Sequence, residues 1–115
     1  MNALVIIDES STGQNRAIHA TELALELARS EGVIVRVYLM GSAIRMACVP
    51  RDGETISELD RHVSRLVSGG VEVAVSEAEM HLRGLVAEDL LLGAQPTPTP
   101  VLAAWTLDAD RILVF

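Results

Sequence analysis

The sequence predicts an α/β fold, a three-layer α/β/α sandwich around a mostly parallel sheet of about five strands. Short runs rich in Val, Ile and Leu alternate with amphipathic segments along all 115 residues. Several of these runs are apolar throughout, which is typical of strands that are buried on both faces of a parallel sheet. The length suits one domain, and we expect residues 1–115 to form it.

The first half of the chain predicts two strands joined by a helix. Ala3–Ile7 is a continuous apolar run and predicts the first strand. Over Gln14–Arg29, apolar residues recur at helical spacing, and Val33–Leu39 predicts the second strand. These segments form a βαβ unit. A short helix over Ser42–Val49 then precedes the turn Pro50–Gly53.

A second amphipathic helix and a third strand follow. Thr55–Glu58 has the pattern of a capping box, and the apolar stripe after it ends before Gly69. Val71–Val75 predicts the third strand. The polar stretch Ser76–Arg83 comes directly after this strand, and we expect it to be a loop.

The last part of the chain is less regular. Leu85–Leu92 predicts a short helix that runs into a brief strand, and the prolines of Gln95–Pro100 predict a turn. Thr99 is expected to cap a helix that continues to about Asp108. Arg111–Phe115 predicts the terminal strand.

Composition narrows the classes of function. A net charge of −7 repels nucleic-acid phosphates and anionic lipid headgroups, so we expect neither nucleic acid nor membrane as a partner. Ala3–Ile7 is too short for the core of a signal peptide, and we expect a cytoplasmic protein. A small chain that is 50% hydrophobic leaves apolar surface for another subunit, so a homo-oligomer is expected.

Cys48 is the single cysteine of the sequence. One cysteine excludes an intrachain disulfide, a CxxC redox pair and any metal site that needs several thiolates. Ser10–Gly13 precedes a helix and offers backbone N–H groups to an anion, but it lacks the spacing of Walker and Rossmann loops. We therefore expect no cofactor.

The candidate binding residues follow the predicted strands. In an open parallel sheet, ligands bind beyond the carboxyl ends of the strands, where loops and helix N-termini meet. The stretch Ser76–Gly84 is the most polar of these segments. The residues at this edge that we select as candidates for binding are Asp8, Gly13, Gly41, Ser42, Ser76, Glu79, His81 and Arg83.

These residues allow more than one chemistry. Glu79 and His81 have the groups for proton transfer, or for binding a hard metal together with Asp8 and Glu9. A solvated acidic loop is the simpler interpretation and the one we favour, so no metal is expected. Arg83 either binds an anion or pairs with a nearby glutamate, and we favour the ion pair.

Three segments in register carry motifs of a known family. Gly13–Ala17 is similar to a Gly-x-x-Arg-Ala start, Leu39–Ala43 to a Met-Gly step after the second strand, and Trp105–Phe115 to a Trp-x-Leu-x-Ala-Asp-Lys-Val-Leu-x-Phe ending. With these motifs, the whole chain resembles the DsrE/DsrF-like (YchN-type) sulfur-relay family. The resemblance implies a DsrE-like fold, trimers or hexamers, and sulfur-relay proteins as possible partners.

The same resemblance places the family's functional loop at Ser76–Gly84. That loop has the pattern Cys-x-x-Cys-x-x-x-Arg-Gly in the family, and its second cysteine carries a persulfide. Arg83 and Gly84 are kept here, but Ser76 and Glu79 stand at the two cysteine positions. Sulfur transfer needs a thiolate, which neither a hydroxyl nor a carboxylate replaces. We therefore favour a non-catalytic oligomeric protein that interacts or binds, and not an enzyme.

Two alternatives stay open. Cys48 could carry sulfur in place of the loop cysteines, although a lone cysteine in the apolar run Ala43–Val49 is more often a small core residue with a raised thiol pKa. The other alternative is a small-molecule-binding module at the Ser76–Gly84 segment, with Ser42 as a further contact.

Overall fold

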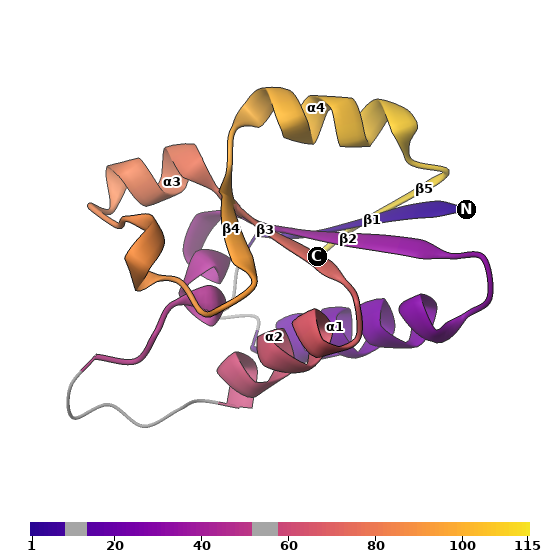
Figure 1. Cartoon of the computed structure of the whole chain (residues 1–115), viewed down its shortest axis with the longest axis horizontal. Coiled ribbons are helices and arrows are strands. Elements are labelled where there is room, and N and C mark those ends of the chain that lie inside the picture. Colours follow the sequence, from indigo (N-terminus) through magenta and orange to yellow (C-terminus); the bar gives the residue numbers. More distant parts are fainter. Residues whose placement is uncertain (9–13, 52–57) are drawn as a thin grey trace.

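The computed structural model describes residues 1–8, 14–51 and 58–115, which form a five-stranded sheet with helices on both faces (Figure 1). In these residues every neighbouring pair of strands is parallel, in the order β4-β3-β2-β1-β5. The three-layer α/β/α fold predicted from the sequence is confirmed. The strands are Asn2–Ile7 (β1), Ile34–Leu39 (β2), Glu72–Ser76 (β3), Ala94–Thr97 (β4) and Arg111–Val114 (β5).

Helices α1 and α2 cover one face of the sheet and α4 covers the other (Figure 1). A short helix, α3, begins where β3 ends and lies beyond the sheet edge. Two 3₁₀ turns, η1 and η2, complete the described elements. Their bounds are Gln14–Arg29 (α1), Gly41–Ala47 (η1), Glu58–Ser68 (α2), Glu77–Leu82 (α3), Ala87–Asp89 (η2) and Thr99–Asp108 (α4).

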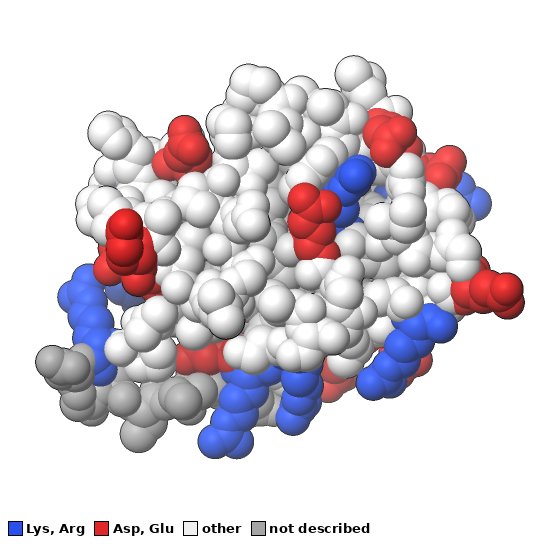
Figure 2. Space-filling view, viewed as in Figure 1, with Lys and Arg blue, Asp and Glu red and all other residues white. Residues whose placement is uncertain are grey.

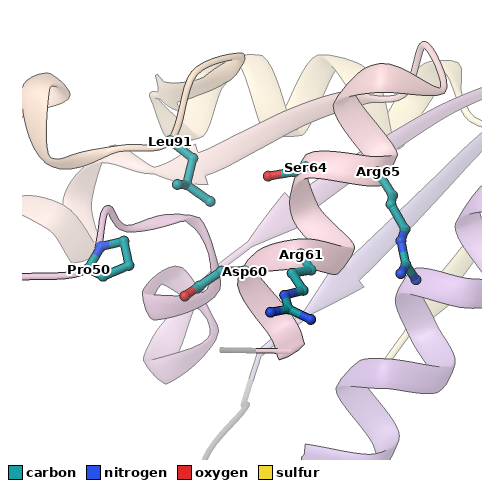
Figure 3. Close-up of a pocket in the computed structure, with 6 residues that line it drawn as sticks. All are labelled: Pro50, Asp60, Arg61, Ser64, Arg65 and Leu91. Carbon is teal, nitrogen blue, oxygen red and sulfur yellow. The ribbon is translucent and has the colours of Figure 1, made fainter. Parts of the chain in front are cut away.

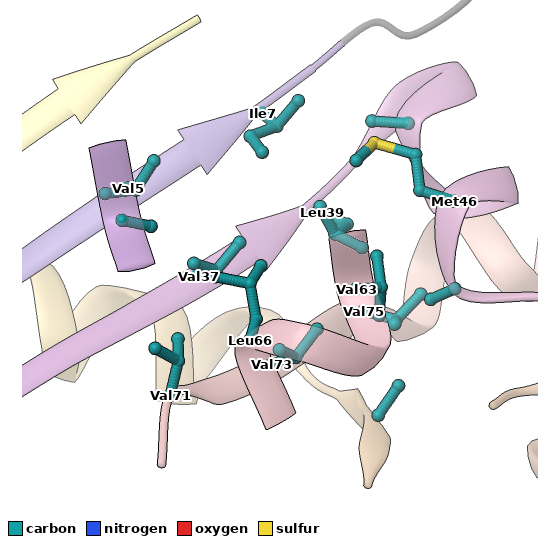
Figure 4. Packing of buried hydrophobic residues seen from close by; sticks show 14 of the residues in the cluster. Val5, Ile7, Val37, Leu39, Met46, Val63, Leu66, Val71, Val73 and Val75 are labelled. Carbon is teal, nitrogen blue, oxygen red and sulfur yellow. The ribbon is translucent and has the colours of Figure 1, made fainter. Parts of the chain in front are cut away.

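The larger core lies between the sheet and the α1/α2 layer (Figure 4). Because side chains alternate between the faces of a strand, every second residue of the central strands points into this core. Small side chains on α1 let that helix lie close to the sheet. The residues at the centre of this core include Val5, Ile7, Ala20, Ala24, Val37, Leu39, Val63, Leu66, Val73 and Val75, all at most 1% exposed.

A smaller core lies under α4. Leu4, Tyr38 and Ala74 point to this face from the three central strands, and Leu102 and Trp105 of α4 pack on them. The guanidinium of Arg36 stacks 5.1 Å from the centre of the Trp105 ring, which adds a cation–π contact at the margin of this layer. One helix therefore covers a face that spans five described strands.

Three local expectations were wrong. Ser76–Arg83 is not a loop, because the segment after Ser76 forms α3. The turn expected over Gln95–Pro100 is in its first half the edge strand β4, where Pro96 is tolerated because β4 has a neighbour on one side only. Thr99 is the first residue of α4 and not its cap, which is Pro98. The Ser76 cap explains α3, and pairing with β3 at the edge of the sheet explains β4.

Smaller differences concern the ends of elements. The segment expected to be a short helix over Ser42–Val49 is the 3₁₀ turn η1, and its last part pairs with the chain after η2 through an antiparallel bridge between Cys48 and Leu90. The brief strand expected within Leu85–Leu92 comes later, as β4. Positions 52–57, which hold most of the expected turn and capping box, lie outside the described residues.

Gly41 allows β1 and η1 to come close together. Its φ of +55° is in the left-handed region, and a Cβ on it would collide with the backbone oxygen and the carboxylate of Asp8. Gly84 has a similar φ of +68°, but no atom lies within 4 Å of a Cβ placed there. A side chain at Gly84 would meet only the strain of a left-handed backbone, whereas a side chain at Gly41 would meet that strain and a collision with Asp8.

We expect Gly41→Ala to lower the free energy of unfolding more than Gly84→Ala does. Both alanines cost about 1–2 kcal/mol from the left-handed backbone, and Gly41→Ala adds the collision with Asp8. Urea denaturation followed by circular dichroism measures both losses. Equal losses would show that the contact between Gly41 and Asp8 is not tight in solution.

Candidate functional site

The candidate residues of the sheet edge follow three adjacent strands that are in register. Ile7 pairs with Leu39, and Leu39 pairs with Val75, so the chain leaves β1, β2 and β3 at one level. Neighbouring strands are about 4.8 Å apart, so the ends of β1 and β3 are roughly 10 Å apart. The structure therefore brings Asp8, Gly41 and Ser76 to one edge.

Ser76 ends β3 and caps α3. Its side chain is buried, and its Oγ accepts a hydrogen bond of 3.2 Å from the backbone N–H of Glu79. Ser76 and Glu79 form the Ser-x-x-Glu pattern of a helix start, which is the sequence signal for α3 that a loop prediction overlooks. The hydroxyl oxygen therefore stabilises the start of α3. Caps of this kind contribute about 1 kcal/mol to stability.

Glu79 and Arg83 form an ion pair one turn apart on α3. The Nε of Arg83 donates to Oε2 of Glu79 at 3.0 Å, and both side chains are partly exposed, at 27% for Glu79 and 37% for Arg83. The ion pair that we favoured from the sequence is present. Partly exposed pairs of this kind contribute about 0–1 kcal/mol. The pair engages one donor of Arg83 and one acceptor oxygen of Glu79, so each of these groups already has a partner within α3.

His81 lies on the exposed side of α3. Together with Glu77 and Ala78 it lines one wall of an open hollow of about 380 Å³, and Pro98, Thr99 and Pro100 form the other wall. The hollow therefore lies between α3 and the start of α4, away from Asp8 and Gly41. The structure divides the predicted set into a group on α3 and a group at the ends of β1 and β2.

In the group at the ends of β1 and β2, backbone hydrogen bonds hold the chain in place. The N–H of Met40 donates to the carbonyl of Ile7 at 2.9 Å, and the N–H of Asp8 donates to the carbonyl of Phe115 at 3.0 Å. Asp8 is exposed, Ser42 is half-buried and has interactions of its own, and Gly13 lies outside the described residues. In residues 1–8, 14–51 and 58–115, no three His, Cys, Asp or Glu side chains form a group that could hold a metal ion.

Cys48 lies at the end of η1 and not on α3. Its thiol is half-buried and donates to the carbonyl of Ile44 at 3.4 Å. Burial raises the pKa of the Cys48 thiol above its ordinary value of 9.0, and the carboxylates of Asp89 and Asp60 raise it further, against the opposing effect of Arg45 and Arg51. At neutral pH the thiol is protonated, and it packs as a small apolar group.

The fold is therefore a parallel α/β sandwich with a short helix, α3, beyond the end of β3. The polar side chains of this helix bind one another, through the Ser76 cap and the Glu79–Arg83 ion pair. The chain belongs to the DsrE/DsrF-like family, whose model matches residues 1–115. Family membership agrees with the resemblance found in the sequence. In the described part of the chain, no helix is long and apolar enough to cross a bilayer.

Two relatives from methanogenic archaea match almost the whole chain. The uncharacterized protein MJ0989 of Methanocaldococcus jannaschii is 28% identical over 115 residues, which is 100% of both chains. The uncharacterized protein MK0008 of Methanopyrus kandleri is 25% identical over 111 residues, which is 96% of this chain and 91% of MK0008.

Solved structures share the fold. The crystal structure of the ychN protein from E. coli has a TM-score of 0.83 and 24% identity, with 100% of both chains covered. The protein MTH1491 of Methanobacterium thermoautotrophicum, a protein of unknown function, has a TM-score of 0.78 and 22% identity over 97% of both chains. At these identities the likeness establishes the fold alone.

The environment of Cys48 predicts a slow reaction with iodoacetamide. We expect the native thiol to react more slowly at pH 8 than in urea-denatured protein, and the native rate to rise as the pH passes 9.0. Because folding raises the pKa, the fold gains stability from the protonated thiol below pH 9.0 and loses it as the pH rises through the native pKa. Rates from mass spectrometry check this, and a native rate at pH 8 equal to the denatured rate would contradict it.

Proposed function

We propose that this chain is a non-catalytic member of the DsrE/DsrF-like family, which acts in the cytoplasm as an oligomeric interaction or binding protein. The observation that carries the proposal is that the side chains of Ser76 and Glu79 make hydrogen bonds within α3. Both stand where sulfur-relay proteins need thiols, and both are engaged in holding α3 together. A hydroxyl that caps a helix and a carboxylate in an ion pair leave no nucleophile for sulfur at this end of β3.

Sulfur transfer makes a defined chemical demand. A thiolate attacks the outer sulfur of a donor R–S–SH, the donor S–S bond breaks, R–S⁻ leaves, and the outer sulfur stays on the attacking cysteine as a persulfide. Cys48 is the one residue of the sequence with a thiol. Its raised pKa and its hydrogen bond to Ile44 reduce the thiolate fraction and therefore support the non-catalytic proposal.

The test is incubation with a small-molecule persulfide donor, alkylation and peptide mass spectrometry. We expect the native protein to gain no sulfur, and we expect Glu79→Cys to gain one sulfur atom on the new cysteine. The variant exchanges an exposed ion pair for a thiol beside Arg83, a cation that lowers the pKa of a thiol. It shows that the assay detects a carrier at this position.

A matched control separates the two thiols. Glu79→Cys combined with Cys48→Ser has a thiol only on α3, so its persulfide must be located there. Added sulfur on Cys48 of the native protein would overturn the non-catalytic proposal and favour a carrier role for Cys48.

The oligomeric part of the proposal is supported by the outer face of α4. The sequence has no charged residue between Leu90 and Leu107, and the exposed side of α4 carries Ala103, Ala104 and Leu107 beside Thr106, with Asp108 as its one charge at the end of the helix. Leu107 is 90% exposed. Figure 2 shows the corresponding upper face as white, with acidic side chains toward its two ends. An exposed surface with so few charges is typical of a surface that contacts another protein.

A second copy of the chain is the partner that we propose for this face. Each copy carries a net charge of −7, so two copies repel each other wherever their carboxylates meet. The uncharged face of α4 is a surface where contact brings no such charges together. Ala103 and Ala104, both exposed, lie at its middle and allow close approach of another helix.

We expect the native protein to have the mass of a trimer or hexamer, and Leu107→Glu to reduce that mass. The new carboxylates would be buried against each other in the contact. Light scattering coupled to gel filtration measures the mass. Leu92→Glu is the matched control, because Leu92 is 96% exposed but lies before β4 and not on α4. A monomeric native protein, or an unchanged mass for Leu107→Glu, would refute this contact.

A further inference from the structure

A cavity of about 330 Å³ opens on the α2 side of the molecule (Figure 3). It uses no residue of the Ser76–Gly84 segment and none of α4. One side of α2 forms a wall, and two segments distant in the sequence close it from the other side. Its lining residues are Pro50, Asp60, Arg61, Ser64, Arg65 and Leu91.

Backbone pairing holds the two apolar lining residues in place. The antiparallel bridge between Cys48 and Leu90 is continued by two hydrogen bonds of 2.7 Å, from Val49 N–H to the carbonyl of Asp89 and from Leu91 N–H to the carbonyl of Ala47. Pro50 follows one of these paired segments, and Leu91 belongs to the other. The apolar side of the cavity is therefore preformed, which reduces the ordering cost of binding.

The polar side of the cavity comes from successive turns of α2. Asp60 is 8% exposed, and in Figure 3 its carboxylate and the hydroxyl of Ser64 turn toward the space near Pro50 and Leu91. Asp60 also interacts within the chain, but a carboxylate has about four acceptor positions and keeps capacity for a ligand. The guanidinium group of Arg61 extends from α2 on the exposed side.

The lining thus combines three kinds of surface: apolar side chains, the mostly buried carboxylate of Asp60, and the exposed arginines Arg61 and Arg65. A purely anionic ligand would bring its charge near Asp60, and a purely cationic ligand would meet Arg61 and Arg65. A ligand that carries both charges matches both partners, because its cationic group pairs with the carboxylate and its anionic group with a guanidinium.

We propose that this cavity binds a small zwitterion with a short apolar body, of the amino-acid type. The ammonium group lies at Asp60 and Ser64, the carboxylate faces Arg61 at the mouth, and the aliphatic body packs between Pro50 and Leu91. The volume is at the lower end of the range for small-molecule sites, which suits a ligand of this size. The proposal does not depend on whether the Ser76–Gly84 segment takes part in sulfur transfer or on whether the protein forms oligomers.

Three probes of equal shape test the match of charges. L-Leucine carries both groups, 4-methylpentanoate is leucine without the ammonium group, and isoamylamine is leucine without the carboxylate. We titrate each into ¹⁵N-labelled protein and follow the amide signals of α2 and Leu91 by NMR. We expect leucine to bind roughly tenfold more tightly than either analogue, as one additional charged contact allows. Equal affinities for the three probes, or no shift with leucine, would overturn the proposal.

Two variants assign the charges to residues. Arg61→Gln should weaken the binding of leucine and of 4-methylpentanoate but not of isoamylamine, which loses a repelling charge. Asp60→Asn should weaken the binding of leucine and of isoamylamine but not of 4-methylpentanoate, for the same reason. Arg61 is exposed, so its variant keeps the fold even if Asp60→Asn is unstable. Arg111→Gln on β5 removes the same charge far from the cavity and serves as the control. An unchanged leucine affinity in Arg61→Gln would refute the assignment.

Discussion

The register of the three central strands decides where Asp8, Gly41 and Ser76 lie relative to one another. Ile7, Leu39 and Val75 are paired across neighbouring strands, and each is fully buried against the α1/α2 layer. A shift of one residue would turn these side chains to the opposite face, so burial holds the register firmly. Once it is set, Asp8, Met40 and Ser76 must leave the sheet at one level. The sheet edge is thus a consequence of core packing.

What happens beyond that edge is decided by weaker interactions. A helix cap contributes about 1 kcal/mol and an exposed ion pair less than that, yet together they turn the segment after β3 into α3. Ser76 and Glu79 are both engaged in this helix. The side chains that hold the core and the side chains that hold α3 are therefore different sets.

The fold was largely predictable, and the errors have physical causes. Strands β1, β2 and β3 and helix α1 follow from apolar runs and helical spacing, because the order of apolar residues in each segment indicates which side chains are buried. Strand β4 was expected too early, within Leu85–Leu92, because Pro96 argues against a strand unless the strand is at an edge, and edge position is a property of the whole sheet. Helix α3 was missed although the Ser-x-x-Glu signal at Ser76 was present. Its high polarity favoured a loop.

By itself, the sequence determined the layer order of the protein and the absence of a thiol at Ser76 and Glu79, since both depend on residue type along the chain. The tertiary structure alone decided that Cys48 lies opposite Leu90. It also decided that Asp60 of α2 shares a cavity with Pro50 and Leu91. Such contacts join segments far apart in the sequence, and they form only when the sheet and its helices are packed together. Local sequence patterns therefore do not predict these contacts.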